Sequence, residues 1–465
     1  MLSKSVPSPR KASDDGFTLI EVIVAMFIFA IISLGVASAL ITTMRVTNDS
    51  VARQTASSLA ASLIDQARTT TDLTTLNSSA TPTNVTVGGR TYHVSTTVLW
   101  GSATGGSDAQ CSSGSGALLN KAVKIQVTWD GMDPKGAPAE ADTVVAPKSR
   151  ISAIDKGVII VSVKNAQGAG NPGVTISVIP SKTNPNGASA ITAPIAPTDA
   201  QGCGYVLNVT PGTYTVSITK PGTSTPSVDI YQSTTPSQSV DVSAASTSPA
   251  PFQFDQSAVF TANYATNFVG SVLLPLTLDT SFVNTYGMYV TNSAGPYYLH
   301  PFSAGYTALA GSLGTSGGSA SNCLSVDPGA WLTTKDASGT WSGIRPKGVA
   351  APAGGPVTAP VPMGVATVTG SANGYIKAVA QTTGPAPSGN PGCAAPATYL
   401  FKLPATGVAN LALPFGSWQL LSGTTSTTQA TNVATTSVVL LTKATVVQVS
   451  GTAVVTFDPR TLVGP

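Results

Sequence analysis

The sequence predicts an α+β protein in which one long N-terminal helix packs on a small antiparallel sheet and is followed by two β-sandwich domains. Three observations support this fold class. An uncharged apolar run from Val22 to Met44 continues into an amphipathic stretch. Short segments of alternating apolar and polar residues then recur to the C-terminus, separated by turns rich in Gly and Pro. Charged residues make up only 9% of the chain, against about 25% in ordinary soluble domains.

Length and charge limit the classes of protein to which the chain can belong. At 465 residues it has room for about two to four domains. Its 23 Lys and Arg residues nearly balance its 20 Asp and Glu residues, and no stretch beyond the N-terminus gathers basic side chains. No nucleic-acid partner is therefore expected. A polar surface with few charges favours a strand-and-turn protein outside the cell over a cytosolic enzyme.

The apolar run from Val22 to Met44 is long enough to cross a bilayer. Lys4, Arg10 and Lys11 precede it, which favours a cytoplasmic leader and places the C-terminus outside. Glu21 stands at the start of the run. A carboxylate in hydrocarbon is costly unless it is paired, so Glu21 needs a cation.

Two simple interpretations of this segment leave Glu21 unexplained. A secretory signal is suggested by the small-x-small sequence at Ala37–Ala39. However, Asp14, Asp15 and Glu21 stand where such signals carry positive charge. A permanent membrane anchor, the second interpretation, has no use for a carboxylate.

A cut between Gly16 and Phe17 gives Glu21 a partner, because a neighbouring copy of the helix can place the new α-amino group against the carboxylate. The sequence G-F-T-L-I-E from Gly16 to Glu21, between a short basic leader and an apolar helix, closely resembles the type III signal of type IV pilins and pseudopilins. The resemblance implies that a prepilin peptidase cuts after Gly16 and methylates the amine of Phe17, and that Glu21 directs assembly. It also implies other pilin subunits and an assembly platform as partners. The chain would then pass once through the cytoplasmic membrane and later enter an extracellular pilus.

The predicted domains follow from this signal: a leader at 1–16, a pilin domain at 17–150 with its helix at 17–68, and two sandwiches at 151–265 and 266–465. The second half of the helix is expected to be amphipathic, with an apolar face made of two adjacent i, i+4 tracks. These tracks are Val51, Thr55, Leu59 and Leu63, and Ala52, Ala56, Ala60 and Ile64.

Three strands of the predicted pilin sheet show period-two alternation. Gly88 and Gly89 separate the first two as a hairpin turn. His93 lies in the second strand and is interpreted as a packed or surface polar residue. In the third strand the apolar face is Val123, Ile125, Val127 and Trp129, and the opposite face is assigned to Lys121, Lys124, Gln126 and Thr128.

The first sandwich resembles transthyretin-like regulatory domains and Cna-B-type modules, through a Thr-Asp-x-x-Gly loop and the sequence T-P-G-T-Y-T-V-S-I-T that begins at Thr210. The region 266–465 is predicted to be a second, Ig-like β-rich domain. There, L-P-F-G-S-W-Q-L-L-S-G from Leu413 repeats the order of turn, aromatic residue and strand.

The four cysteines are predicted to form disulfides, since no C-x-x-C motif occurs and the chain is expected to be exported. Of three connectivities, we favour Cys323 with Cys393, because both lie in Gly- and Pro-rich loops of one region. This leaves Cys111 to pair with Cys203. The only histidines are His93 and His300, so neither a metal site nor a cofactor is expected.

Two motifs of enzyme and sorting signals occur out of context. G-T-S-G-G at Gly314–Gly318 matches a hydrolase elbow but has no strand before it or helix after it. L-P-A-T-G at Leu403–Gly407 matches a sortase signal but is not followed by an anchor. We therefore expect no enzyme activity. Aromatic residues in predicted loops are candidates to stack on a sugar or protein ligand: Tyr297, Tyr298, Trp331 and Trp341.

The predicted function is that of a minor type IV pilin with a large β-sandwich head, carried in an extracellular filament, preferably at its tip, and acting in adhesion or surface binding to an unidentified ligand. The main alternative is a pseudopilin of a type II secretion or DNA-uptake machine. A third possibility is a membrane-anchored surface protein that never polymerises and is not cut after Gly16.

Overall fold

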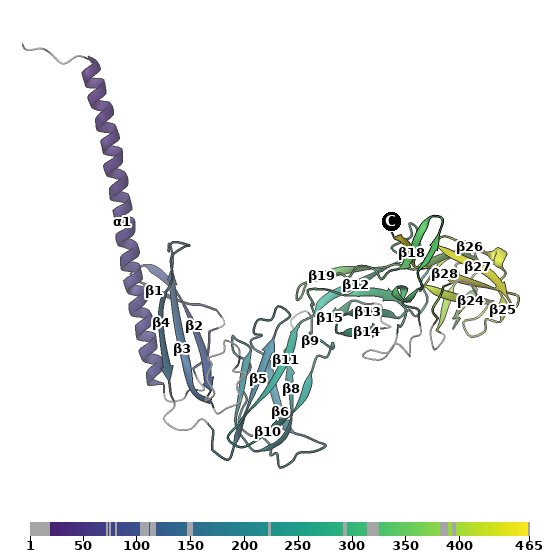
Figure 1. Ribbon diagram of the computed structural model, residues 1–465, viewed down its shortest axis with the longest axis horizontal. Helices are drawn as coiled ribbons and strands as arrows, with labels where there is room; N and C mark the ends of the chain where they lie inside the picture. Colours follow the sequence, from purple (N-terminus) through teal and green to yellow (C-terminus); the bar gives the residue numbers. More distant parts are fainter. Residues whose placement is uncertain are drawn as a thin grey trace, which may run out of the picture. The chain divides into compact units, whose positions relative to one another are not determined.

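The computed structural model contains, within its described residues, one α-helix followed by a long series of β-strands (Figure 1). This arrangement confirms the predicted α+β class. The chain divides into two compact units, of which unit 1 comprises 1–98 and 120–148 and unit 2 comprises 99–119 and 149–465. The structure describes residues 19–70, 73, 76–79, 81–102, 111, 118–146, 152–221, 225–291, 295–313, 325–381, 389–392 and 397–463.

Helix α1 runs from Leu19 to Thr69, with Glu21 in its first turn and Arg68 in its last. Both charges complement the helix dipole. The first half of α1 is exposed on all sides. The second half buries one stripe of small residues, as the alanine track predicts, whereas Val51 in the neighbouring track is exposed. The buried residues are Ala52, Ala56, Ala60, Ile64 and Ala67.

The sheet of unit 1 is an antiparallel meander in the order β1-β2-β3-β4. Gly88 and Gly89 form the turn between the first two strands, and both have the positive φ that glycine adopts without strain. Alternate side chains of β2 and β3 are buried, as expected from the pattern. The strands are β1 (Thr83–Val87), β2 (Arg90–Ser102), β3 (Leu118–Trp129) and β4 (Ala139–Val145).

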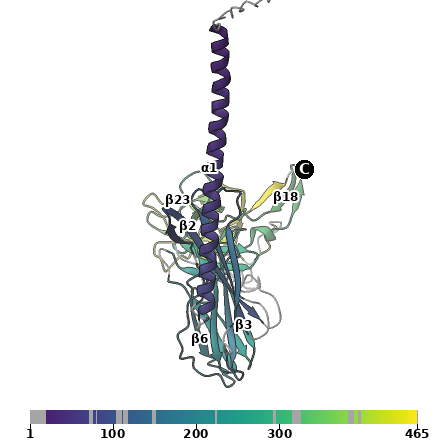
Figure 2. The ribbon, with the colours of Figure 1, turned by 90° about the vertical axis from the view of Figure 1, so that its left-hand side faces the viewer.

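The second half of α1 lies against this sheet, and its first half extends beyond it (Figures 1 and 2). The guanidinium of Arg68 donates through Nε to Thr143 Oγ1 at 2.9 Å, which fixes the end of the helix beside β4. Arg53 donates to the Ala137 carbonyl at 3.0 Å, and its guanidinium carbon lies 5.6 Å from the centre of the Trp129 ring. Small alanine side chains allow the close approach, and the arginines fix the register.

Lys121 is a correction to the predicted faces of β3. It has the same parity as Val123 and is only 3% exposed, so it lies on the buried face and not beside Lys124. Its ammonium donates to the carbonyl of Leu76 in the connector before β1. The long side chain is tolerated inside because the charge reaches a backbone acceptor.

Unit 2 begins with a β-sandwich whose two sheets have the orders β7-β5-β11-β9 and β10-β8-β6. Side chains of both sheets share one core around Ile159, Val216 and Phe254. The β5–β11 pair is parallel, and the other pairs in these two sheets are antiparallel. The strands are β5 (Gly157–Lys164), β6 (Thr175–Pro180), β7 (Cys203–Val209), β8 (Gly212–Thr219), β9 (Ser227–Asp229), β10 (Ser237–Val242) and β11 (Thr247–Gln256).

The next strand departs from the sequence prediction, which includes the stretch up to Ala265 in this sandwich. Strand β12 (Ala258–Tyr264) instead pairs with β15 and β19, and its Phe260 belongs to a second core with Phe282 and Tyr306. A second sheet of this region has the order β14-β13-β16. The further strands are β13 (Thr280–Asn284), β14 (Gly287–Thr291), β15 (Tyr297–Leu299), β16 (Thr307–Ala310) and β19 (Pro356–Val361).

The rest of unit 2 forms a third core around Phe401, Trp418 and Phe457. Its sheets have the orders β23-β20-β26 and β22-β21-β24-β28-β27, with β25 paired to β24, and a small sheet has the order β17-β18-β29. The strands are β17 (Thr334–Asp336), β18 (Gly339–Gly343), β20 (Gly364–Thr369), β21 (Tyr375–Ala380), β22 (Thr398–Lys402), β23 (Val408–Leu413), β24 (Gly416–Gly423), β25 (Thr431–Asn432), β26 (Val438–Leu440), β27 (Ala444–Val449), β28 (Thr452–Phe457) and β29 (Arg460–Val463).

The order of turn, aromatic residue and strand that begins at Thr210 and recurs from Leu413 corresponds to the same local structure in both places. Tyr214 donates its hydroxyl to the carbonyl of Thr210 at 2.9 Å, and Trp418 donates Nε1 to the carbonyl of Pro414 at 2.8 Å. Each acceptor lies four residues before its aromatic donor. The glycines two residues before each aromatic ring, Gly212 and Gly416, have φ of 149° and 135°. A shared turn of this kind fixes where β8 and β24 begin.

Candidate functional site

The first half of α1 is the clearest candidate site in unit 1, because its apolar side chains are exposed within that unit. The helix is long and apolar enough to cross a membrane. The part up to Met44 extends roughly 39 Å, at about 1.5 Å per residue, which exceeds the hydrocarbon thickness of a bilayer. Such a surface requires lipid or other helices around it.

Glu21 lies in the first turn of α1 with its side chain at the helix surface. It is the only ionisable side chain of α1 before Arg45. Gly16 and Phe17, which the sequence predicts as the cleavage and methylation residues, lie outside the described residues.

Comparison with protein families identifies this segment. A family model described as the prokaryotic N-terminal methylation motif matches residues 11–37, a span that includes Gly16, Phe17 and Glu21. The chain carries a pilin-type N-methylation motif. The methylation motif and the apolar helix behind it together indicate that the protein is anchored in a membrane before assembly.

Solved structures offer only distant likenesses. The TIE protein of Bacillus anthracis is 11% identical with a TM-score of 0.19, covering 74% of this chain and 67% of that one. A streptococcal ancillary pilin is 11% identical with a TM-score of 0.18, covering 52% and 76%. The major pilin subunit of Bacillus cereus is 10% identical with a TM-score of 0.15, covering 63% and 96%. With TM-scores this low, the likenesses support no inference about this chain. No curated protein sequence matches it.

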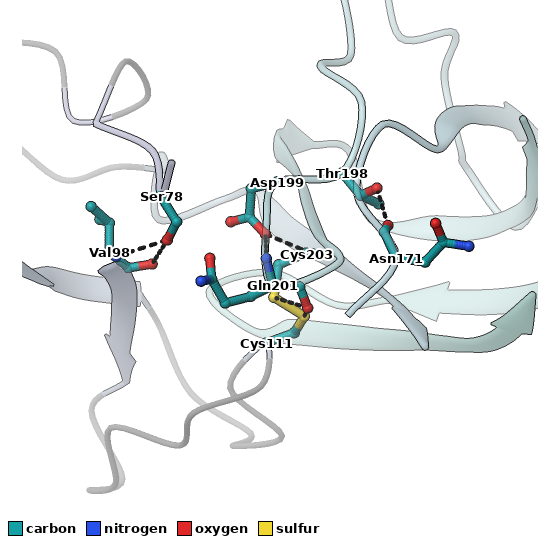
Figure 3. Close-up of a disulfide and its surroundings, with 8 residues drawn as sticks. All are labelled: Ser78, Val98, Cys111, Asn171, Thr198, Asp199, Gln201 and Cys203. Atoms are coloured by element: carbon teal, nitrogen blue, oxygen red, sulfur yellow. Dashed lines mark hydrogen bonds between the residues drawn. A yellow bond between two sulfur atoms is a disulfide. The ribbon is translucent and has the colours of Figure 1, made fainter. Parts of the chain in front are cut away.

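The disulfide of unit 2 joins Cys111 to Cys203 across 92 residues of sequence (Figure 3). Cys203 begins β7 directly after a tight turn. In that turn, Asp199 Oδ1 accepts hydrogen bonds from the amides of Gln201 and Cys203 at 3.0 and 2.9 Å. The carboxylate therefore fixes the backbone that presents one sulfur. Cys323 and Cys393, predicted to form the other pair, lie outside the described residues.

The two histidines are held by structural contacts. His93 lies within hydrogen-bonding distance of Asn84 and Asp130, at 2.7 and 3.0 Å. His300 is only 1% exposed, and its Nδ1 donates to the Val228 carbonyl at 3.1 Å. Burial lowers the pKa of His300, and this effect outweighs the hydrogen bond to Val228 and the charges of Asp255 and Asp229, which raise it. Within the described part of the chain, no group of three His, Cys, Asp or Glu side chains is arranged to hold a metal ion.

Of the two out-of-context motifs, the hydrolase-elbow match and the sortase-signal match, only the second lies within the described residues. Gly314–Gly318 lies outside the described residues. In Leu403–Gly407, the amide of Gly407 donates to the carbonyl of Pro404 at 2.9 Å, and Gly407 has φ of 69°. This segment is the turn between β22 and β23, and the glycine is required by the positive φ.

The aromatic residues that the sequence nominates for ligand contact are mostly covered. Tyr297 and Trp331 are buried. Trp341 lies beneath Lys443, whose Nζ is 3.5 Å from the centre of the indole ring. Of the four, only Tyr298 is exposed, at 38%. The prediction was wrong for Tyr297, which lies in strand β15 and not in a loop, and for Trp331, whose loop position does not expose its ring.

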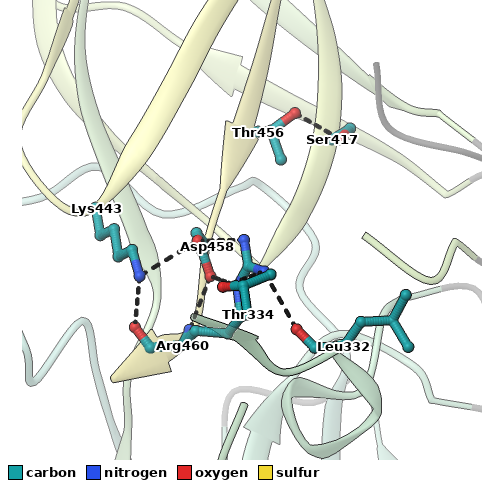
Figure 4. Close-up of polar contacts among 7 residues, drawn as sticks. All are labelled: Leu332, Thr334, Ser417, Lys443, Thr456, Asp458 and Arg460. Atoms are coloured by element: carbon teal, nitrogen blue, oxygen red, sulfur yellow. Dashed lines mark hydrogen bonds and ion pairs between the residues drawn. The ribbon is translucent and has the colours of Figure 1, made fainter. Parts of the chain in front are cut away.

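An ion cluster that contacts Trp331 and Trp341 holds β29 in place. Figure 4 shows its charged side chains, Lys443, Asp458 and Arg460. Arg460 pairs with both oxygens of Asp458, from Nε at 2.9 Å and from Nη2 at 2.8 Å, and Lys443 Nζ lies 3.4 Å from the same carboxylate. Burial alone would raise the pKa of Asp458. The hydrogen bonds and charge of Arg460, with the charge of Lys443, outweigh it and hold that pKa below its usual value. Lys443, Asp458 and Arg460 therefore have a structural role, which is to hold β29.

Proposed function

We propose that this chain is a minor type IV pilin whose β-rich head acts in adhesion or surface binding. The observation that carries the proposal is the methylation motif at 11–37 leading into a helix whose apolar surface is uncovered in unit 1. In a filament, the equivalent helices of neighbouring subunits cover that surface. The motif supports a pilin-like filament subunit, and the adhesive role rests on the large head.

Processing is the first step of the proposed life cycle. A prepilin peptidase cuts after Gly16 and methylates the amine of Phe17, while the C-terminal part of the chain is outside the membrane. An assembly platform then extracts the subunit into the growing filament. There the amine of one subunit pairs with Glu21 of its neighbour, because both charges are poorly solvated among apolar helices.

The size of the head favours a minor subunit. The proposed head at 151–465, in which the first sandwich ends before β12, is much larger than the proposed pilin domain at 17–150. Few such heads fit around a thin helical fibre at every lattice position. We therefore place the subunit at the filament tip or at sparse positions along the shaft.

Mass spectrometry of sheared surface filaments tests the proposal. The expected result is a mature N-terminal peptide that begins with N-methylated Phe17. The protein recovered only in membranes, with Phe17 at its N-terminus, would favour a pseudopilin of a secretion or DNA-uptake machine. Recovery with Met1 still attached would identify a surface protein that never polymerises and would overturn the pilin assignment.

A further inference from the structure

Unit 2 contains a pocket with the features of a ligand-binding site. The stability of the fold does not explain these features. The pocket volume is about 310 Å³, at the lower end of the range for small-molecule sites. It lies between the turn after β9 and the hairpin of β13 and β14. Its aromatic lining is Tyr231, Tyr286, Tyr289 and Tyr306, and its polar lining includes Gln232 and Asn284.

Two of these tyrosine rings are exposed to solvent, and packing within the fold does not explain their exposure. Tyr231 is 75% exposed and Tyr286 is 52% exposed, although tyrosine rings in this protein are otherwise mostly covered. One face of Tyr286 stacks on Phe302, with ring centres 4.6 Å apart and planes inclined by 16°. The exposed part of Tyr286 is therefore the opposite face and its edges, which leaves a flat apolar surface for a ligand.

The turn that carries Tyr231 is held rigidly. Asp229 Oδ1 accepts hydrogen bonds from the amides of Tyr231 and Ser233 at 2.9 and 2.7 Å. Gln232 has φ of 67°, which is unusual for a residue other than glycine. Its side chain accepts from the His300 amide at 2.7 Å and donates to the Tyr306 hydroxyl at 3.0 Å. The turn therefore holds the backbone of Tyr231 in one position, so little backbone ordering entropy is lost on binding.

The hydrogen-bonding groups left over in the pocket are neutral. Within the described residues, the hydroxyls of Tyr231, Tyr286 and Tyr289 make no hydrogen bond. Asn284 uses Oδ1 to accept from the amides of Tyr286 and Gly287, at 2.8 and 3.1 Å, which leaves the donors on Nδ2 available. None of the residues that line the pocket is charged. A phosphate, sulfate or carboxylate ligand would find no counter-charge there.

We propose that this pocket binds a neutral saccharide. A pyranose ring has an apolar face of C–H groups and a rim of hydroxyls, which matches exposed tyrosine faces beside free phenol and amide groups. A proline-rich peptide also packs on aromatic side chains, but it needs an extended groove and few hydroxyl partners. The compact, hydroxyl-rich pocket favours the sugar. This inference deepens the proposed adhesive role and rests on it by naming the ligand class of the head.

Binding of the full-length mature protein, purified in detergent, tests the assignment. The probes are an array of neutral hexose and N-acetylhexosamine oligosaccharides, acidic glycans, and proline-rich peptides in the same format. We expect binding to neutral glycans. With the best array glycan in calorimetry, Tyr231→Ala and Tyr286→Ala should each weaken binding at least tenfold. Tyr231→Phe, which keeps the ring and loses the hydroxyl, should weaken it less.

Tyr298→Ala is the matched control, because Tyr298 is exposed but does not line the pocket. It should bind like the wild type. Truncating Tyr231 is not expected to disturb folding, which thermal unfolding of each variant checks. No binding to neutral glycans by folded wild-type protein, unchanged binding in both alanine variants, or binding to the peptides alone would each overturn the saccharide assignment.

Attachment assays on cells separate this inference from the adhesive role. Cells that carry the Tyr231→Ala, Tyr286→Ala double variant should attach to a surface coated with the array glycan at least tenfold less than the wild type. If they attach as well as wild-type cells, while cells lacking the head do not attach, the pocket assignment is wrong and the adhesive role stands. If cells lacking the head attach normally, the adhesive role itself is wrong.

Discussion

At the residue scale, Glu21 has the strongest sequence signal, and one substitution there tests its proposed role in filament assembly. We expect Glu21→Gln, which keeps the shape and removes the charge, to lower the amount of this protein in sheared filaments at least tenfold. The reason is that the α-amino group of the neighbouring subunit then loses its counter-charge in an apolar setting. Quantitative immunoblots of filament and membrane fractions measure the effect.

Asp65→Asn is the control for that experiment, since Asp65 is an exposed acidic residue of α1 whose partner, Arg68, is also exposed. It should assemble like the wild type because exposed ion pairs contribute little. Filaments that contain normal amounts of the Glu21→Gln protein would show that the carboxylate does not direct assembly.

His300 makes the stability of unit 2 dependent on pH. Its folded-state pKa lies below its usual value of about 6.5, so the unfolded chain binds a proton that the folded chain does not. Its contribution to stability is therefore complete above about pH 6.5 and is lost as the pH falls below that value, by at most about 1.4 kcal/mol per pH unit.

We expect the thermal midpoint of unit 2 to fall between pH 7 and pH 5, and His300→Gln to flatten that slope. His93→Gln is the control, because His93 is partly exposed in unit 1. Calorimetric scans at several pH values measure both variants. An equal slope in wild type and His300→Gln would mean that other groups cause the acid sensitivity.

At the scale of elements, the two aromatic turns before β8 and β24 should each stabilise the core that they border. Tyr214→Phe removes the hydroxyl that donates to the half-buried Thr210 carbonyl and accepts from the Ser189 amide at 3.1 Å, so we expect a loss of about 1 kcal/mol. Trp418→Phe loses a donor and ring volume, for which we expect roughly 2 kcal/mol. Denaturant titrations measure both, with Tyr298→Phe as the control. Wild-type stability of Tyr214→Phe would show that its hydroxyl is dispensable.

The Cys111–Cys203 bridge is a second element-scale prediction. It closes a loop of 92 residues, for which the chain-entropy account gives about 4.5 kcal/mol. We expect the double variant Cys111→Ser, Cys203→Ser to lower the free energy of unfolding of unit 2 accordingly. Because a chain of several domains does not unfold in one step, hydrogen exchange along β7 is the sharper measurement. Equal protection in the variant and the wild type would show that the bridge does not stabilise this strand.

At the scale of the whole molecule, the head and the assembly helix should be separable. Truncation after residue 148, combined with Cys111→Ser because its partner is removed, should leave filaments in normal numbers but lower attachment of cells at least tenfold. Electron microscopy counts the filaments, and a surface-attachment assay measures adhesion. Normal attachment by the truncated strain would place the adhesive surface elsewhere.

The sequence by itself determined features that depend on neighbours along the chain. The methylation motif, the apolar run behind it and the alternation in β2 and β3 are local patterns, and Gly88 and Gly89 specify a turn through their own backbone freedom. The alanine stripe of α1 follows from the helical period. Even the echo around Tyr214 and Trp418 is local, since each ring bonds four residues back.

Only the tertiary structure decided what depends on distant segments. The sheet to which β12 belongs depends on its parallel pairing with β19, and Lys121 is satisfied by Leu76 in a connector. Tyr297 is buried while Tyr231 is exposed, although both stand beside turns. The saccharide pocket joins the turn after β9 to the β13–β14 hairpin. The physical reason is that burial and hydrogen-bond satisfaction are properties of what packs against a residue, and the local period of a sequence does not contain them.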